Sequence, residues 1–178
     1  MHMIKTKRLR IQPFKEADRL DMVNLLCNDD IKKTFMIPDF ATIQEAERLF
    51  YSFMKWSQEE ARYERGIYLA NQLIGFVNTV GIEKSCIELG YVIHPEHQNQ
   101  GYATEVLQAV IADLFTKGYR EICAGAFQEN TASCRVMERC GMQRIQKTAE
   151  VDYRGYRHSC IYYSIHKNEA VIREDTLR

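Results

Sequence analysis

The segment HPEHQNQGYA, residues 94–103, separates a β-rich stretch of the sequence from a long helical one. The preceding run SCIELGYVIH (85–94) predicts a strand. After the segment, apolar residues recur at the i, i+3, i+4 spacing of an amphipathic helix: Ala103, Val106, Leu107, Val110, Ile111, Leu114 and Phe115. The run YREICAGAF (119–127) then predicts a second strand. Such a β-α-β unit closes by a right-handed crossover between parallel strands.

Outside this unit, the alternation and periodicity of apolar residues predict further strands and helices. The N-terminal part has a strand (9–14), two helices (15–28 and 42–61) and two strands (66–70 and 73–82), with hairpin turns at Asn71-Gln72 and Glu83-Lys84. The C-terminal part has a helix (130–140, ended by Gly141) and a hairpin (142–153 and 159–166). This order predicts an α/β fold with a mixed, mostly antiparallel sheet and helices on both faces.

Composition narrows the class of protein. The 178 residues predict a single domain over 1–178, with a core of about 5–166 and a C-terminal tail at 167–178. Lys plus Arg and Asp plus Glu number 24 each, so no overall charge favours nucleic acid or anionic membrane. Neither a signal peptide nor a run of about 18 apolar residues is present. We therefore expect a cytoplasmic protein, monomeric or homodimeric.

The cysteines predict neither a zinc ribbon nor a redox motif. Six are scattered without a Cys-x-x-Cys pair, and we expect them to be reduced and mostly buried. His94 and His97 form a His-x-x-His pair, but no further ligand stands at a matching spacing. The sequence therefore predicts no metal site.

The loop at 98–103 has the features of an anion-binding turn. A strand that runs through it into a helix leaves unpaired N–H groups at the positive end of the helix dipole. Gly101 and Ala103 would let a bulky anion such as a diphosphate approach the backbone. The alternative is an ordinary β-α turn in which glycine only relieves strain. The two common phosphate motifs G-x-x-x-x-G-K-[ST] and G-x-G-x-x-G are absent.

Gln98, Gly101 and Ala103 fill the pattern [QR]-x-x-G-x-[GA] of the GNAT superfamily of acyl-coenzyme A (CoA) dependent N-acetyltransferases, which this chain resembles. TKRLRIQPF (6–14) is similar to the opening strand of that family, ELGYVIHPEH (88–97) to its fourth strand, and NTASCRVMERCGM (130–142) to its asparagine-containing helix. Within the superfamily, these motifs most resemble the branch of ribosomal-protein alanine N-acetyltransferases and polyamine acetyltransferases.

The resemblance implies a GNAT fold with a splayed parallel strand pair, in which the gap admits the pantetheine arm of acetyl-CoA. By position in the motifs, the residues expected to bind the coenzyme are Tyr91, Val92, Ile93, Gln98, Asn99, Gln100, Gly101, Tyr102, Ala103, Thr104, Asn130 and Ser133. Asn130 and Ser133 could equally cap the helix that follows. Arg135 and Arg139 could reach the nucleotide phosphates or could simply be exposed.

The resemblance also suggests catalytic roles for Glu88 and Ser133. An ammonium acceptor must lose a proton, and Glu88 stands in the fourth strand where it could act as the base, or else serve only structure. Many relatives carry a tyrosine as general acid at the position of Met137. Ser133 could hydrogen-bond to the leaving sulfur instead. Less certain donors are Tyr91, Tyr153, Tyr162 and Tyr163.

The acetyl acceptor is the least determined part of the prediction. We expect direct attack by a primary amine, preferably the α-amine of a peptide or protein. The alternatives are a polyamine or other small amine, or an acyl-CoA-binding sensor without catalysis. Candidates to line the acceptor site are Phe35, Met36, Phe40, Trp56, Tyr153 and Tyr156, although all could be core residues. The acidic residues Glu59, Glu60 and Glu64 could steer a polyamine or form a solvated helix face, and Ser159 replaces an aspartate common in relatives.

Overall fold

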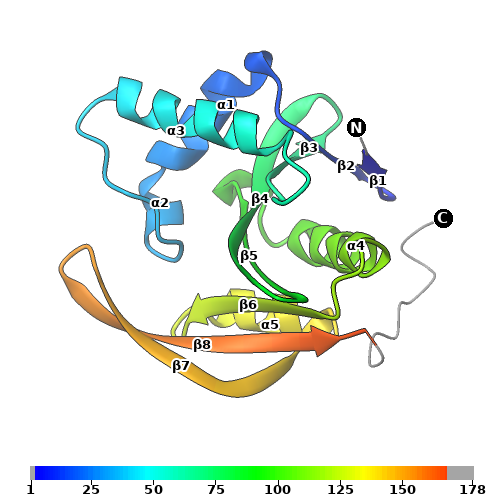
Figure 1. The fold of residues 1–178 in the computed structure, drawn as a ribbon. Coiled ribbons are helices and arrows are strands. Elements are labelled where there is room, and N and C mark those ends of the chain that lie inside the picture. Colours follow the sequence, from blue (N-terminus) through cyan, green and yellow to red (C-terminus); the bar gives the residue numbers. More distant parts are fainter. Residues whose placement is uncertain (1–2, 168–178) are drawn as a thin grey trace.

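The computed structural model describes residues 3–167 and contains one eight-stranded sheet in the order β1-β2-β3-β4-β5-β6-β8-β7 (Figure 1). The predicted tail at 167–178 lies outside the described residues apart from Lys167. The strands are β1 (Ile4–Lys5), β2 (Leu9–Gln12), β3 (Arg65–Leu69), β4 (Gln72–Glu83), β5 (Cys86–Ile93), β6 (Glu121–Phe127), β7 (Gln143–Tyr153) and β8 (Tyr156–His166). Among them, β5 and β6 form the one parallel pair, so the predicted mixed, mostly antiparallel sheet is confirmed.

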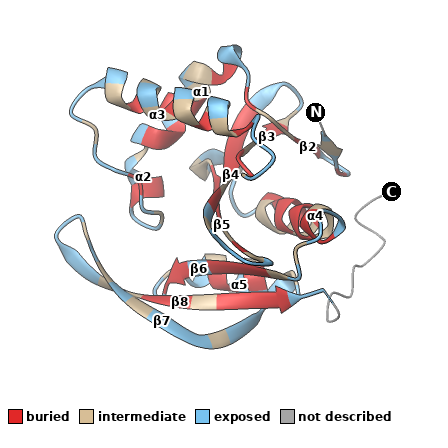
Figure 2. Cartoon of the chain, viewed as in Figure 1, coloured by how far each residue is buried: buried red, intermediate tan, exposed pale blue. Residues whose placement is uncertain are grey.

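Helices cover both faces of the sheet, as predicted (Figures 1 and 2). They are α1 (Arg19–Cys27), α2 (Asp29–Lys32), α3 (Ile43–Trp56), α4 (Tyr102–Thr116) and α5 (Thr131–Arg139), with 3-10 turns at Glu16–Asp18 and Pro95–His97. None of the helices within residues 3–167 is long and apolar enough to cross a membrane.

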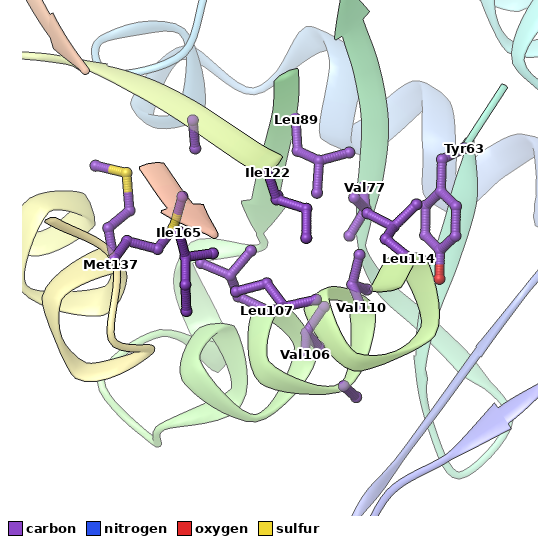
Figure 3. Close-up of a cluster of buried hydrophobic side chains, with 14 of the residues drawn as sticks. Tyr63, Val77, Leu89, Val106, Leu107, Val110, Leu114, Ile122, Met137 and Ile165 are labelled. Atoms are coloured by element: carbon purple, nitrogen blue, oxygen red, sulfur yellow. The ribbon is translucent and has the colours of Figure 1, made fainter. Parts of the chain in front are cut away.

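Two apolar cores hold the helices to the sheet. One packs α4 and α5 against residues of β4, β5, β6 and β8 such as Leu89 and Ile122 (Figure 3). The other packs α1 and α3 against the opposite face, around Phe50 and Phe76. Because side chains alternate across a strand, Ile87 and Leu89 of β5 enter the first core, while Glu88 and Gly90 belong to the opposite face. On this face, called the open face below, β5, β6 and β8 carry residues of intermediate exposure such as Glu88, Glu121 and Tyr162.

Several element boundaries differ from the prediction. The first helix begins at Arg19, after a 3-10 turn, instead of at residue 15, and its residue Leu20 is 66% exposed. The second ends at Trp56 instead of 61, where the Ser57 hydroxyl bonds to the Met54 carbonyl at 2.7 Å. The two hairpin turns fall one residue from the predicted pairs, with left-handed φ values of 51° at Ala70 and 53° at Lys84. Strand β1 and helix α2 were not predicted because each is too short for a periodic pattern.

The parallel pair separates halfway along its length. Residues 86–89 of β5 pair with 121–124 of β6, and no pairing follows. Beyond that point β5 continues along β4, from Gly90 opposite Asn78 to Ile93 opposite Gly75. Strand β6 continues along β8 to Phe127 instead. This divergence is the splay that the resemblance implied.

Candidate active site

A cavity of about 430 Å³ lies where β5 and β6 diverge. Its walls come from the end of β5, the loop before α4, the end of β6, and α5, with Ile31, Thr34 and Phe35 at the side of α2. The predicted coenzyme-binding residues that line it are Tyr91, Val92, Ile93, Gln98, Asn99, Gly101, Tyr102, Ala103, Thr104, Asn130 and Ser133. Gln100 does not line it, and neither does Glu88. Arg135 and Arg139 do, so both basic side chains of α5 border the cavity.

The loop before α4 presents main chain to the cavity. Asn99 and Gly101 adopt left-handed φ values of 59° and 79°. No side chain caps the helix that begins at Tyr102, so the N–H groups of its first turn receive no side-chain acceptor. The Gln98 side chain donates from Nε2 to the carbonyl of Ile93 at 2.9 Å. This bond ties the loop to the end of β5.

Arg8 and Glu105 hold the same loop in place through hydrogen bonds. The sequence analysis assigned no role to either residue. Arg8 donates from Nε to Glu105 Oε2 at 2.7 Å and from Nη1 to the carbonyl of Gln100 at 2.8 Å. Its guanidinium also lies 4.4 Å from the centroid of the Tyr102 ring. Gln100, which does not line the cavity, is thus held by its carbonyl to Arg8 and by its side chain to the Glu96 carbonyl at 3.3 Å. Two features of the sequence could have indicated these roles. Arg8 lies inside the TKRLRIQPF motif, and Glu105 is an acidic residue on an otherwise apolar helix face.

The buried Glu105 carboxylate is held by three donors. It accepts from the Thr6 hydroxyl at 2.5 Å, from the Arg8 main-chain N–H at 2.8 Å and from the Arg8 guanidinium. Burial pushes the pKa of Glu105 upward, but the hydrogen bonds and the Arg8 charge outweigh burial and bring its pKa below the ordinary value. The carboxylate is therefore ionised at neutral pH and anchors the turn between β1 and β2 to α4.

Tyr91 and Ser133 form a hydroxyl pair inside the cavity. Their oxygen atoms lie 2.8 Å apart, and Tyr91 also donates to the Ser133 carbonyl at 3.2 Å. Burial raises the pKa of Tyr91 well above its usual value, so its hydroxyl keeps its proton at neutral pH. Asn130 acts as the N-cap of α5, because its Oδ1 accepts from Ser133 N at 3.1 Å. The capping role proposed as an alternative for Asn130 is therefore real.

The other candidate proton donors lie outside the cavity. Met137 is fully buried in the core between α5 and the sheet and has no proton to donate (Figure 3). Tyr163 donates to Glu138 at 3.1 Å, and Tyr153 donates to the carbonyl of Ile37 at 2.8 Å. Tyr162 lies under the ammonium group of Lys147. Of the candidate proton donors, only Tyr91 and Ser133 thus line the cavity.

Glu88 lies on the open face of the sheet, two residues before the cavity-lining Gly90. Its Oε2 accepts from Lys147 Nζ at 2.9 Å. Lys147 comes from an irregularity in β7, where the register with β8 shifts between Arg144 and Thr148. The bond to Glu88 raises the pKa of Lys147, so that side chain stays cationic at neutral pH. An ion pair therefore lies on the open face of β5, next to the cavity but outside its lining.

Gly90 allows Asn78 and Phe35 to pack closely against β5 beside the cavity. A Cβ atom there would lie 2.7 Å from Asn78 Oδ1 and 2.9 Å from the Phe35 ring. Asn78 Oδ1 is buried and has no hydrogen-bond partner among the described residues. Phe35 lines the cavity and meets the ring of Phe76 edge to face. Glycine is thus required at position 90 by close packing and not by its backbone angles.

The remaining acceptor-site candidates are dispersed. Tyr153, near the tip of the β7–β8 hairpin, joins the loop after α2 through its bonds to Phe35 and Ile37. Phe40 faces the Lys32 ammonium, Met36 is 50% exposed, and Tyr156 is 74% exposed in β8. Trp56 stacks on Arg62, away from the first cavity.

The acidic cluster does not form a helix face. Glu59 and Glu60 follow the end of α3 and line a second cavity, together with basic residues including Arg62 and Lys117. Glu64 is 1% exposed, 3.6 Å from Arg62, and burial raises its pKa. The solvated helix face is therefore wrong, because α3 ends before these residues. The steering of a polyamine stays a prediction.

The cavity between the splayed parallel strands, bordered by a glycine-containing loop and an uncapped helix, is the candidate active site. The chain matches the model of the acetyltransferase (GNAT) domain over residues 8–143 and belongs to this family. It is therefore an acyl-CoA-dependent acetyltransferase. It is 31% identical over 148 residues to the uncharacterized N-acetyltransferase YnaD of Bacillus subtilis (strain 168), covering 81% of this chain and 84% of that protein.

Solved structures agree with this fold. The ribosomal L7/L12 α-N-protein acetyltransferase RimL in complex with coenzyme A matches with a TM-score of 0.83 and 18% identity, over 93% of this chain and 98% of that one. The spermidine N-acetyltransferase of Vibrio cholerae, in complex with CoA and spermine, matches with a TM-score of 0.78 and 21% identity, over 91% and 97%. Proteins acting on different amines therefore share this architecture.

Proposed function

We propose that this protein transfers the acetyl group of acetyl-CoA to the α-amine of a peptide or protein N-terminus by direct attack. The observation that carries the proposal is the cavity between β5 and β6, which opens where their pairing stops after Leu89 and Ala124. One strand edge, one helix N-terminus and the Tyr91–Ser133 hydroxyl pair border it. In this proposal the strand edge supplies main-chain donors, the helix N-terminus binds the anion, and the hydroxyl pair donates a proton, all in the same cavity.

The loop and α5 suit the coenzyme chemically. The uncapped first turn of α4 offers N–H donors to a diphosphate, and the helix dipole adds partial positive charge. At Gly101 the backbone is open to close approach, since a Cβ would meet only Arg8, at 3.5 Å. Arg135 and Arg139 would supply further positive charge to the phosphates. When bound, acetyl-CoA supplies an acetyl group activated as a thioester.

The end of β5 would hold the reacting carbonyl. From Tyr91 to Ile93 this strand has a neighbour only on the β4 side, so main-chain N–H groups on its other edge lack a strand partner. Such preorganised donors stabilise the negative charge that develops on a carbonyl oxygen under attack. Tyr91 and Ser133 would then protonate the departing thiolate, directly or through their shared hydrogen bond.

Glu88 would accept the proton of the attacking amine. It projects from the same face as Gly90, about 7 Å along the strand from it, which is within reach of one bridging water. An α-amine has an ordinary pKa of about 7.7 to 8.0, so part of it is already neutral at neutral pH. A modest base suffices for such an acceptor.

Charge near the site favours an α-amine over a polyamine. Lys147 already pairs with Glu88 and would repel a polycation there. The acidic residues that could attract one, Glu59 and Glu60, line a different cavity beside Lys84 and Lys117. A peptide carries one ammonium group at its N-terminus and needs no row of carboxylates.

The test compares acceptors at equal concentration and follows the release of the CoA thiol. The panel is a short peptide with a free N-terminus, the same peptide with a blocked N-terminus and a free lysine, and spermidine. We expect the free peptide to be acetylated fastest. Faster turnover of spermidine than of the free peptide would show that the acceptor is a polyamine and not an α-amine. Tight acetyl-CoA binding without turnover of any amine in a broad panel would instead favour the sensor.

A further inference from the structure

Four potential metal ligands come together on the open face of the sheet, outside the cavity of the proposed acetyl transfer. Cys86 belongs to β5, Glu121 and Cys123 to β6, and His166 to β8. Glu121 and Cys123 stand two residues apart on one strand, and His166 is directly opposite Glu121. Both relations place side chains on the same face.

The donor atoms lie close together. The sulfur atoms of Cys86 and Cys123 are 3.3 Å apart, and the Cys123 sulfur is 3.5 Å from Glu121 Oε1. His166 Nε2 is 3.7 Å from that same carboxylate oxygen. The ligand atoms of Cys86, Glu121 and Cys123 all fall within 4.8 Å of one another.

We propose that Cys86, Glu121, Cys123 and His166 bind a thiophilic divalent cation of the zinc class. With zinc–sulfur bonds of about 2.3 Å, two thiolates in a tetrahedral site lie about 3.8 Å apart, so the two sulfur atoms need to separate by only about 0.5 Å. Two thiolates, one carboxylate and one imidazole make a ligand set that binds zinc in preference to magnesium or calcium. Binding requires that both thiols lose their protons to solvent.

The strand register favours a bridging cation over a disulfide. Cys86 is opposite Glu121, not Cys123, so the two cysteines are offset by two residues on neighbouring strands. A strand rise of about 3.3 Å and a strand separation of about 4.8 Å give a Cα–Cα distance of about 8 Å. Disulfides require less than about 7 Å without backbone movement. A metal ion spans the offset without moving the sheet.

The site is rigid and accessible. The β5–β6 and β6–β8 ladders fix the backbone of its ligands, so binding requires only that the side chains adjust. Cys123 is 8% exposed, whereas the His166 side chain is 53% exposed and leaves an entry path from solvent. Sequence spacing missed the site because its ligands come from three strands that are far apart in the chain.

The test titrates Co²⁺ into the reduced, chelator-treated full chain and follows the thiolate-to-cobalt charge-transfer band. We expect one equivalent to bind and Zn²⁺ to displace it. Cys86→Ser and Cys123→Ser should each abolish the band. Glu121→Gln should weaken Co²⁺ affinity by about tenfold or more. Cys27→Ser is the matched control, because Cys27 is exposed and lies apart from this cluster.

Several results would overturn the proposal. One is the absence of a charge-transfer band in the reduced parent. Another is a band that survives both serine substitutions or that depends on Cys27. Circular dichroism and thermal melting of the serine variants exclude misfolding as the cause of a lost band. If either variant unfolds, Zn²⁺ protection of Cys86 and Cys123 from alkylation in the parent, read by mass spectrometry, gives the same decision.

Discussion

Lys147 Nζ lies 2.9 Å from Glu88 Oε2 and 4.1 Å from the centroid of the Tyr162 ring. An ammonium group between a carboxylate and an aromatic face is the arrangement expected for a bound amine substrate. Here a side chain of the protein, from the edge strand β7, takes that place. We infer that an incoming amine competes with Lys147 for Glu88.

If Glu88 takes the amine proton, Glu88→Gln lowers kcat by about 100-fold or more and leaves the acetyl-CoA Kd nearly unchanged. The amide keeps the shape of the side chain but is no base. Steady-state rates across pH and calorimetric titration with acetyl-CoA measure the two effects. A rate within about twofold of the parent at every pH would mean that Glu88 has a structural role and is not the base.

Lys147→Met separates competition from catalysis at the same carboxylate. Removing the competing ammonium should lower KM for the amine by a few-fold, because a half-exposed pair is worth about 1 kcal/mol or less. The kcat value should not fall. A loss of kcat as deep as that of Glu88→Gln would mean that the pair works as a unit.

The Tyr91–Ser133 pair is expected to protonate the leaving thiolate. Tyr91→Phe should lower kcat by about tenfold, a modest effect because a thiol of pKa about 8.5 is already a fair leaving group. Tyr163→Phe is the control, since that buried hydroxyl bonds to Glu138 outside the cavity. Equal losses in the two variants, measured by thiol release, would remove Tyr91 from the chemistry.

Gly101→Asp should abolish acetyl-CoA binding while the chain still folds. The substitution adds a negative charge where the diphosphate is proposed to lie, and strain at a φ of 79°. Gly118→Asp is the matched control, because Gly118 has a φ of 98°, open space around its Cβ position and no contact with the first cavity. Calorimetric titration of both variants with acetyl-CoA measures the effect. Unchanged acetyl-CoA affinity in a folded Gly101→Asp protein would show that the diphosphate does not bind at this loop.

Sequence reasoning recovered those features that periodicity and local motifs encode. The amphipathic stripe of α4 and the asparagine that caps α5 were both readable, and so was the loop that borders the cavity. The resemblance to known acetyltransferases supplied the splay, which no single strand pattern could predict. Elements of a few residues, such as α2, escaped because they complete no period.

What sequence reasoning missed depends on contacts between distant residues. Arg8 reaches Glu105 and the Gln100 carbonyl across more than 90 positions, and Lys147 reaches Glu88 through a local irregularity in β7. The cysteine prediction was only partly right for the same reason. All six are free thiols, but Cys86 and Cys140 are half-buried and Cys27 is exposed. Spacing along the chain cannot indicate which side chains a sheet register brings together.

The anchor between Arg8 and Glu105 should make stability depend on acid pH. The folded-state pKa of Glu105 is lowered, so its contribution to stability is present above the unfolded pKa of about 4.3 and is lost as pH falls through the folded value. Glu105→Gln should therefore lower the free energy of unfolding by about 2 kcal/mol at neutral pH, where it removes the charge from buried hydrogen bonds. The difference from the parent should shrink as both proteins are acidified below about pH 4.

Urea unfolding of parent and variant over this pH range measures that difference. Glu47→Gln is the control: its partner Arg19 is partly exposed, so the cost should stay below about 1 kcal/mol. Since Arg8 also holds the Gln100 carbonyl, Glu105→Gln should weaken acetyl-CoA binding in the folded protein as well. A stability difference that stays constant from neutral to acid pH would contradict the assignment of a lowered pKa. Unchanged acetyl-CoA affinity would limit Glu105 to holding the β1–β2 turn against α4.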